Sequence, residues 1–159
     1  MSIEKVKSYF KELGIEDRIL EFSVSSATVA LAAEALGCEP ERIAKTLSFV
    51  KDDSCILVVA AGDARVDNAK FKAEFGMKAK MADFNEVARL CGHAAGGVCP
   101  FAVNEGVPIY LDLSLKRFDY VYPAAGSSNS AIKLTLAELE KYSNFIKWVD
   151  VCKLPEFTF

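Results

Sequence analysis

The sequence predicts an α/β domain of the α+β type, in which one mixed β-sheet, partly barrel-like, is surrounded by helices. Segments with helical and with strand periodicity are interspersed, and several neighbouring strands are joined by short loops, which excludes a regular β-α-β alternation. The chain has 159 residues, 52% of them hydrophobic, which suits one domain with a sizeable core. Because no repeat or linker interrupts it, we expect a single domain over residues 1–153 and a short apolar tail over residues 154–159.

The first elements follow from local periodicity and from the residues that begin and end helices. Residues 3–13 repeat apolar side chains at helical spacing, which predicts an amphipathic helix. The alternation in residues 19–24 predicts a short strand. A second helix is expected over residues 29–36, begun by a hydroxyl residue and ended by Gly37.

A β-hairpin is the clearest prediction in the chain. Strands are expected at residues 43–50 and 55–61, joined by the polar stretch 51–54. The second strand is almost uniformly apolar, so we expect it to be central and covered on both faces.

The remaining elements are marked by capping residues and glycines. Asp67 and Asp83 can each begin a helix, and Thr135 with Glu138 forms the pattern of a capping box. We expect helices at 67–75, 83–90 and 136–142 and strands at 108–111, 120–123, 131–134 and 146–151.

Composition and charge exclude several classes of protein. The net charge of −3 and the pI of about 5.3 argue against broad, non-specific nucleic-acid binding, though not against a small nucleic-acid footprint. The bases between Arg65 and Lys80 are best interpreted as a solvated face. The longest apolar run, 55–61, is far shorter than the roughly 20 residues of a membrane-spanning helix. Since Met1–Lys5 leads straight into charged residues, we expect no secretory signal and a cytoplasmic location.

The standard catalytic motifs are absent. His93 is the sole histidine, and no G-x-S-x-G, G-x-G-x-x-G or G-x-x-x-x-G-K-[ST] pattern occurs. The five cysteines contain no C-x-x-C pair. Cys91, His93 and Cys99 could supply three metal ligands, but the spacing is loose and a fourth ligand is missing, so buried structural thiols are favoured. Nothing in the sequence requires a metal or another cofactor.

Two features point to a ligand site. Lys45 shares a strand face with apolar neighbours, so its ammonium must reach solvent or meet an anion such as a phosphate; a protective lysine on an edge strand is the alternative. The loop 92–101 contains adjacent glycines that could turn backbone N–H groups toward a carbonyl oxygen, although it could equally be a plain connection. A second loop, 124–130, could complete a pocket.

The order of these motifs resembles one known family. Ala44-Lys-Thr-Leu47, Gly62-Asp63, Val66-Asp67, Gly92-His93 and Gly96-Gly-Val-Cys-Pro-Phe101 are similar to motifs of the YbaK-like aminoacyl-tRNA deacylases, relatives of the editing domain of bacterial prolyl-tRNA synthetases. Pro108, Asp112, Gly126 and Lys133-Leu-Thr135 continue the order. The resemblance covers about residues 20–150 and implies an editing domain that hydrolyses the ester of a misacylated tRNA.

The resemblance also implies roles for individual residues. Lys45 matches the essential strand lysine, and Gly96–Pro100 matches the Gly-x-x-x-Pro loop that holds the aminoacyl ester, so Lys45, Gly96 and Gly97 are the expected catalytic residues. The expected substrate-binding residues are Thr46, His93, Pro100, Phe101, Gly126, Ser127 and Ser128. Water or a group on the substrate serves as nucleophile, which agrees with the missing triad.

The expected substrate is tRNA-Pro carrying a small amino acid. Ala124 and Ala131 stand where cysteine-specific members carry a serine and an acidic residue, so cysteine is not the default, and alanine, serine and threonine remain open. The expected partners are the 3′ end of the mischarged tRNA and, as a candidate, prolyl-tRNA synthetase; the oligomeric state is open. The main alternative is a non-catalytic tRNA- or synthetase-binding module, and the least favoured is thiol redox chemistry at Cys99, which lacks a resolving cysteine.

Overall fold

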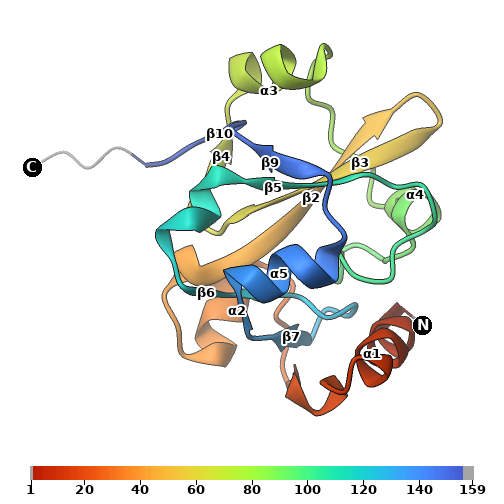
Figure 1. The fold of residues 1–159 in the computed structure, drawn as a ribbon, viewed down its shortest axis with the longest axis vertical. Coiled ribbons are helices and arrows are strands. Elements are labelled where there is room, and N and C mark those ends of the chain that lie inside the picture. The colour runs from red at the N-terminus through yellow and green to blue at the C-terminus, as the bar shows by residue number, and fades with distance from the viewer. Residues whose placement is uncertain (1, 156–159) are drawn as a thin grey trace, which may run out of the picture.

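The computed structural model describes residues 2–155 and has one six-stranded mixed sheet at its centre (Figure 1). The strands lie in the order β8-β6-β2-β3-β5-β9, and the sheet curls into a half-barrel with helices around it. Its strands are β2 (Ile43–Lys51), β3 (Ser54–Ala61), β5 (Ile109–Asp112), β6 (Tyr120–Pro123), β8 (Leu134–Thr135) and β9 (Lys147–Val149). The predicted mixed α/β single domain is therefore confirmed.

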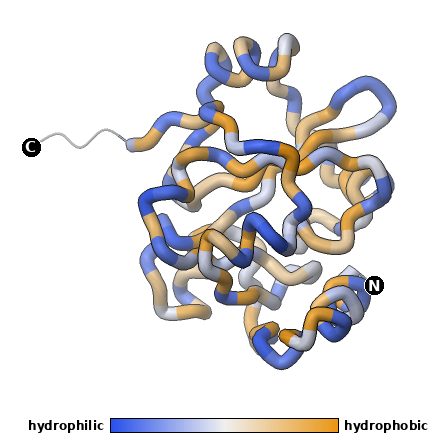
Figure 2. The backbone as a smooth tube through the Cα atoms, viewed as in Figure 1, coloured by the Kyte–Doolittle hydropathy of each residue, from blue (hydrophilic) through white to orange (hydrophobic). Residues whose placement is uncertain are grey.

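The hairpin of β2 and β3 forms the middle of the sheet. The two strands pair antiparallel from Ala44 opposite Ala61 to Lys51 opposite Ser54. Strand β3 is buried from its second residue to its last, as its apolar sequence predicted, because parallel β5 covers its other edge. In Figure 2 the turn of this hairpin is hydrophilic and the strands that it joins are largely hydrophobic.

Two short ladders lie outside the main sheet. Strand β1 (Ile19–Glu21) pairs with β7 (Ser130–Ile132), and β4 (Arg65–Val66) pairs with β10 (Cys152–Lys153). The single strand expected at 131–134 was wrong, because its first part pairs with β1 and the rest, as β8, pairs with β6. The strands β4 and β10 were not predicted, since two residues carry no recognisable periodicity.

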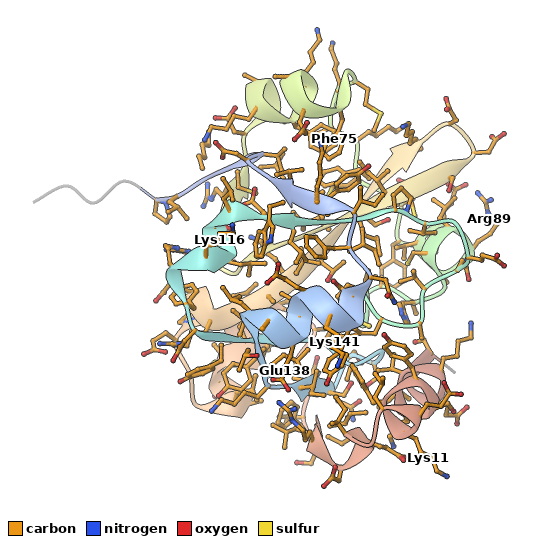
Figure 3. The ribbon with its side chains drawn as sticks, viewed as in Figure 1. Lys11, Phe75, Arg89, Lys116, Glu138 and Lys141 are labelled. Carbon is orange, nitrogen blue, oxygen red and sulfur yellow. The ribbon has the colours of Figure 1, made fainter. Side chains whose placement is uncertain are left out.

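The helices cover the sheet and close the core. They are α1 (Ser2–Glu12), α2 (Val29–Leu36), α3 (Asn68–Phe75), α4 (Val87–Cys91) and α5 (Leu136–Ser143), with 3-10 turns η1 (Glu16–Arg18), η2 (Pro40–Arg42) and η3 (Leu113–Arg117). Helix α1 buries Val6 and Phe10 completely, and Phe75 of α3 points toward the sheet and contacts Tyr110 (Figure 3). No helix within residues 2–155 is long and apolar enough to cross a membrane.

The helix boundaries show where local signals suffice. Helix α2 has the expected bounds, with Thr28 as N-cap and Gly37 in the left-handed conformation at its end. The helix expected at 83–90 begins only at Val87, because Asp83 closes a separate turn by accepting from Glu86 and Val87 N–H. Of the expected tail 154–159, residues 154 and 155 are exposed and the others lie outside the described residues.

Candidate functional site

A pocket of about 250 Å³ opens beside β2, on the side away from β3. Three of the expected site residues, Lys45, Thr46 and Gly96, line it together. They come from two places far apart in the sequence, strand β2 and the loop after α4, which the fold brings together. A pocket of this size lies just below the range of about 300–1,000 Å³ usual for ligand sites, so it has room only for a small group.

Lys45 is held in place by main-chain oxygens. Its Nζ donates to Gly62 O at 3.3 Å and to Ala64 O, and burial of the half-buried side chain lowers its pKa. The turn that carries these oxygens is itself fixed, because Ala61 N–H donates to the buried Ser114 Oγ at 3.1 Å. Ser114 N–H in turn donates to Asp112 Oδ2 at 2.9 Å. The ammonium therefore has a fixed position, and the part of the chain that the structure describes satisfies two of its three donors.

A second cavity, a groove of about 700 Å³, lies next to the pocket and shares Lys45 with it. Arg65 and Lys153, which pair across the β4–β10 ladder, line this groove. Asp63 also lines the groove, and its carboxylate is paired with Arg117 at 3.0 Å. The groove thus offers two basic residues beside the Lys45 ammonium, and neither forms an ion pair with another residue in the described range 2–155.

Ala124 and Ala131 form one wall of the pocket. They face each other in an isolated antiparallel bridge, and both line the pocket. The two positions that the sequence singled out as departures from the cysteine-specific pattern are therefore neighbours. Their methyl groups leave this wall small and apolar.

The two adjacent glycines of the loop 92–101 have different surroundings. Gly96 has a φ of +90° and lines the pocket. Gly97 does not: its N–H donates to Ala94 O at 3.0 Å, and an added Cβ would lie 2.8 Å from Ser127 Cα. Gly97, one of the expected catalytic residues, therefore faces the 126–127 backbone and does not line the pocket. Pro100 is buried behind the loop.

His93 and Phe101 lie behind the pocket wall and not in it. Both are completely buried, and His93 Nε2 donates to Phe101 O at 2.6 Å, while Phe101 packs edge-on against Phe10. Burial lowers the pKa of His93, which keeps the ring neutral. The expected direct contact of these two residues with substrate is not what the structure provides; they hold the loop in shape. Burial also raises the pKa of the neighbouring Cys99 thiol to about 12, so it carries no thiolate at neutral pH.

The loop 124–130 supports the pocket from behind. Gly126 lies under α1, where an added Cβ would come within 2.9 Å of Ser2 O. Ser127 Oγ lies within hydrogen-bond distance of Asn129 and Ser130 side chains. Ser128 O accepts from Ser26 N–H at 2.6 Å, which ties this loop to a segment that lines the pocket. These three expected binding residues therefore hold the Ala124–Ala131 wall in position but do not themselves line the pocket.

Sequence reasoning missed the rim of the pocket. Met81 and Phe84 line it while remaining 50% and 77% exposed. Phe84 was expected inside a helix, and no local signal marks the segment before it as a partner of β2. Within residues 2–155 no group of three or more His, Cys, Asp or Glu side chains could hold a metal ion.

The structure is thus a small α/β domain in which a fixed lysine lies between a mainly apolar pocket and a basic groove. A family model described as the aminoacyl-tRNA editing domain matches residues 24–142. The chain belongs to this family, and the resemblance seen in the sequence is confirmed.

Known relatives agree with this assignment. The uncharacterised protein YwhH of Bacillus subtilis (strain 168) is 51% identical over 154 residues, which cover 96% of this chain and 98% of YwhH. A proline–tRNA ligase of Shouchella clausii (strain KSM-K16) is 35% identical over 95 residues, 59% of this chain but only 17% of the ligase. A crystal structure of a candidate trans-editing enzyme for prolyl tRNA synthetase superposes with a TM-score of 0.84 at 29% identity, covering 96% of this chain and 97% of that one.

Proposed function

We propose that this protein is a freestanding editing hydrolase that removes a small amino acid from mischarged tRNA, with tRNA-Pro as the first candidate. The observation that carries the proposal is the position of Lys45, whose ammonium is fixed between an apolar pocket and a basic groove. The 3′ end of an aminoacyl-tRNA has the matching parts: a small acyl group, and next to it a phosphate chain.

Lys45 binds a phosphate of the terminal nucleotide in this proposal. Two of its donors are satisfied by Gly62 O and Ala64 O, so the charge stays in place with a donor to spare, and a preorganised charge loses no free energy to reorganisation when the ligand binds. Arg65 and Lys153 continue the positive charge along the groove, where the preceding phosphates would lie.

The chemistry is hydrolysis of the ester between amino acid and ribose. A water molecule adds to the ester carbonyl carbon, the bond from that carbon to the ribose oxygen breaks, and the ribose oxygen takes a proton, which leaves free amino acid and tRNA. The sole histidine is buried and neutral, so no side-chain triad operates. Orientation of the ester and stabilisation of the oxyanion by backbone N–H groups supply the rate enhancement.

The pocket wall favours small acyl groups. Ala124, Ala131 and Gly96 border a space of about 250 Å³. A side chain at Gly96 would be strained because its φ is +90°, and its Cβ would lie close to the Ala27 and Ser128 Cβ atoms, at 3.3 and 3.4 Å. Family membership and the likeness to the candidate trans-editing enzyme support prolyl-tRNA synthetase as a functional partner in the cytoplasm. We take residues 1–153 as the editing domain.

A panel of mischarged tRNAs tests the proposal. tRNA-Pro charged with labelled alanine, serine, threonine, cysteine or proline is incubated with the protein, and release of the amino acid is compared with spontaneous hydrolysis. We expect accelerated release of at least one small non-cognate amino acid and none of proline. Binding of the same tRNAs without any accelerated release would overturn the enzyme assignment and support a non-catalytic binding module.

A further inference from the structure

The outer edge of β2 is covered at two places and open between them. At its start, β2 pairs with β6 over its first two residues. Further along, Ala82 N–H donates to Ser48 O at 2.9 Å and Val50 N–H donates to Lys80 O at 2.8 Å. Between these two covers Thr46 has both of its backbone groups on this edge, and Ser48 N–H, which shares the edge, has no hydrogen bond to another described residue.

The direction of the Thr46 peptide groups follows from the ladder. Along an antiparallel strand the N–H and C=O groups of alternate residues point to the same edge. Ser48 and Val50 bond outward, away from β3, so Thr46 does too. The facing strand agrees, because Leu57 and Ala61 N–H groups donate to acceptors outside β2.

These groups open into the pocket. Thr46 lines it, and its buried Oγ1 has no hydrogen-bond partner among the described residues. A buried polar group without a partner is costly and uncommon in folded proteins. Thr46 therefore has a backbone donor and a backbone acceptor on the edge that borders the pocket, and a buried hydroxyl without a partner beside them.

We propose that the aminoacyl group of the substrate pairs with Thr46 as a single added residue of β-structure. The ester carbonyl accepts a hydrogen bond from Thr46 N–H, and the α-ammonium donates one to Thr46 C=O. This inference rests on the proposed function. Two residues facing each other in an antiparallel ladder exchange both bonds in this way, whereas a parallel partner spreads them over two residues, so one amino acid can satisfy Thr46 only in the antiparallel direction.

The direction of pairing places the rest of the substrate correctly. In the antiparallel direction the carbonyl end of the acyl group runs toward the start of β2. There the Lys45 ammonium meets the Gly62 and Ala64 oxygens beside the basic groove. The ammonium end runs toward Ser48, where the segment 80–82 closes the edge. The carbonyl end therefore points toward the positive charge, and the ribose must turn away from the edge of β2 before the β6 pairing at Ala44.

The same bond supplies an oxyanion donor. Thr46 N–H remains directed at the carbonyl oxygen as that oxygen gains negative charge during attack by water. Gly97 N–H cannot do so, since it donates to Ala94 O. Recognition of the amino acid is thus divided between two parts of the pocket. Thr46 forms hydrogen bonds with the ammonium and the carbonyl that all amino acids share, and the Ala124–Ala131 wall limits the size of the side chain.

Replacing the ammonium by a hydroxyl tests the pairing in activity. Alanyl-tRNA and lactyl-tRNA differ only in this group, and each rate is divided by its own spontaneous hydrolysis rate. A charge-assisted hydrogen bond is stronger than a neutral one, so we expect the wild type to favour alanyl-tRNA by about tenfold or more. Thr46→Val keeps both peptide groups and must keep this preference, which separates the main chain from the hydroxyl.

A binding measurement tests the donor directly. 3′-Alanylamino-3′-deoxyadenosine, an amide that resists hydrolysis, is titrated into ¹⁵N-labelled protein. We expect the Thr46 amide proton to move downfield by more than that of Leu47, whose N–H points to β3. A saturable titration that leaves the Thr46 amide unmoved would overturn the pairing, as would equal normalised rates for alanyl- and lactyl-tRNA. If no aminoacyl-tRNA is hydrolysed at all, it is the proposed function that fails.

Discussion

Strands β2 and β3 are neighbours in one hairpin, yet they do different work. From Cys55 to Ala61, β3 has no side chain more than 2% exposed, and both of its edges are paired. Strand β2 carries Lys45, Thr46 and Ser48 opposite the apolar residues of β3. Part of its outer edge has no partner strand among the described residues. One strand builds the core and the other borders the pocket.

This difference between the two strands indicates where the fold can provide a ligand site. A fully paired and buried strand has no polar group left for a ligand, because each N–H and C=O is already satisfied. On β2 the cover provided by β6 and by the segment 80–82 stops short on both sides of Thr46. The site therefore depends on incomplete pairing as much as on Lys45.

Among these variants, Lys45→Ala on β2 is expected to have the largest effect on activity. We expect kcat/KM for mischarged tRNA to fall by about 10²–10³-fold, because a preorganised charge is lost. The free energy of unfolding should change by no more than about 1 kcal/mol, since the half-buried lysine leaves two carbonyl oxygens that water can reach. Deacylation rates and thermal melts measure the two effects.

Lys45→Arg is the matched variant. A planar guanidinium cannot reproduce the compact ammonium between two carbonyls, so we expect only partial recovery. Undiminished activity in the alanine variant would mean that Lys45 merely protects an edge strand.

Leu57→Ala tests the opposite behaviour on β3. Leu57 is completely buried, and truncation of a core leucine typically costs about 2–5 kcal/mol through lost burial and a cavity. We expect that loss in urea unfolding, while kcat/KM of the folded fraction stays within a few-fold of the wild type. A folded variant with activity as low as that of Lys45→Ala would show that the two strands are not separable.

Gly97→Ala tests the support of the pocket. Its Cβ would meet Ser127 and Gly126 backbone atoms at 2.8–2.9 Å, so one loop must move, at a cost of about 1–3 kcal/mol typical of overpacking. We expect lower thermal stability and lower rates on every mischarged tRNA, with the ranking of amino acids unchanged. A changed ranking at full stability would place Gly97 in the pocket wall.

The ion pair of Arg18 and Glu138 provides the smallest expected effect, remote from both strands. Hydrogen bonds from Arg18 lower the pKa of Glu138 to about 2. A depressed pKa contributes stability that is present above the unfolded value of about 4.3 and is lost as the pH falls toward 2. Because the Arg18 side chain is 37% exposed, we expect less than about 1 kcal/mol.

Urea unfolding at pH 6, 4 and 3, with Glu138→Gln as control, measures this contribution to the free energy of unfolding. The free energy of unfolding of the variant should fall less between pH 6 and pH 3 than that of the wild type. Equal pH dependence of the two proteins would contradict the assignment.

Local signals predicted the elements that local interactions determine. Helix α2 has a capping hydroxyl and a terminal glycine within its own sequence, and the apolar run of β3 already implied burial on both faces. The resemblance placed Lys45, Thr46 and Gly96 together at the pocket. What failed depended on distant partners: the split of 131–134 depends on β1 and β6.

The same reason explains the expected site residues that do not line the pocket. His93 and Phe101 do belong to the loop that borders the pocket. However, the Phe101 ring packs against Phe10 of α1, and the His93 ring donates its hydrogen bond to Phe101 O. The opening at Thr46 could not be predicted, because it exists only where two segments from elsewhere in the chain stop pairing. Spacing along a sequence carries no record of such a gap.

The short opening on β2 also decides how long an acyl chain can be. An amino acid on Thr46 points its nitrogen toward Ser48, where Lys80 and Ala82 already occupy the edge. A peptide bond on that nitrogen would place the next residue against these two. In the proposed pairing, the next residue of peptidyl-tRNA would meet an edge that is already covered, although its ester is chemically the same as that of alanyl-tRNA. The proposal therefore predicts that peptidyl-tRNA is hydrolysed more slowly than alanyl-tRNA, which would protect a growing polypeptide on the ribosome.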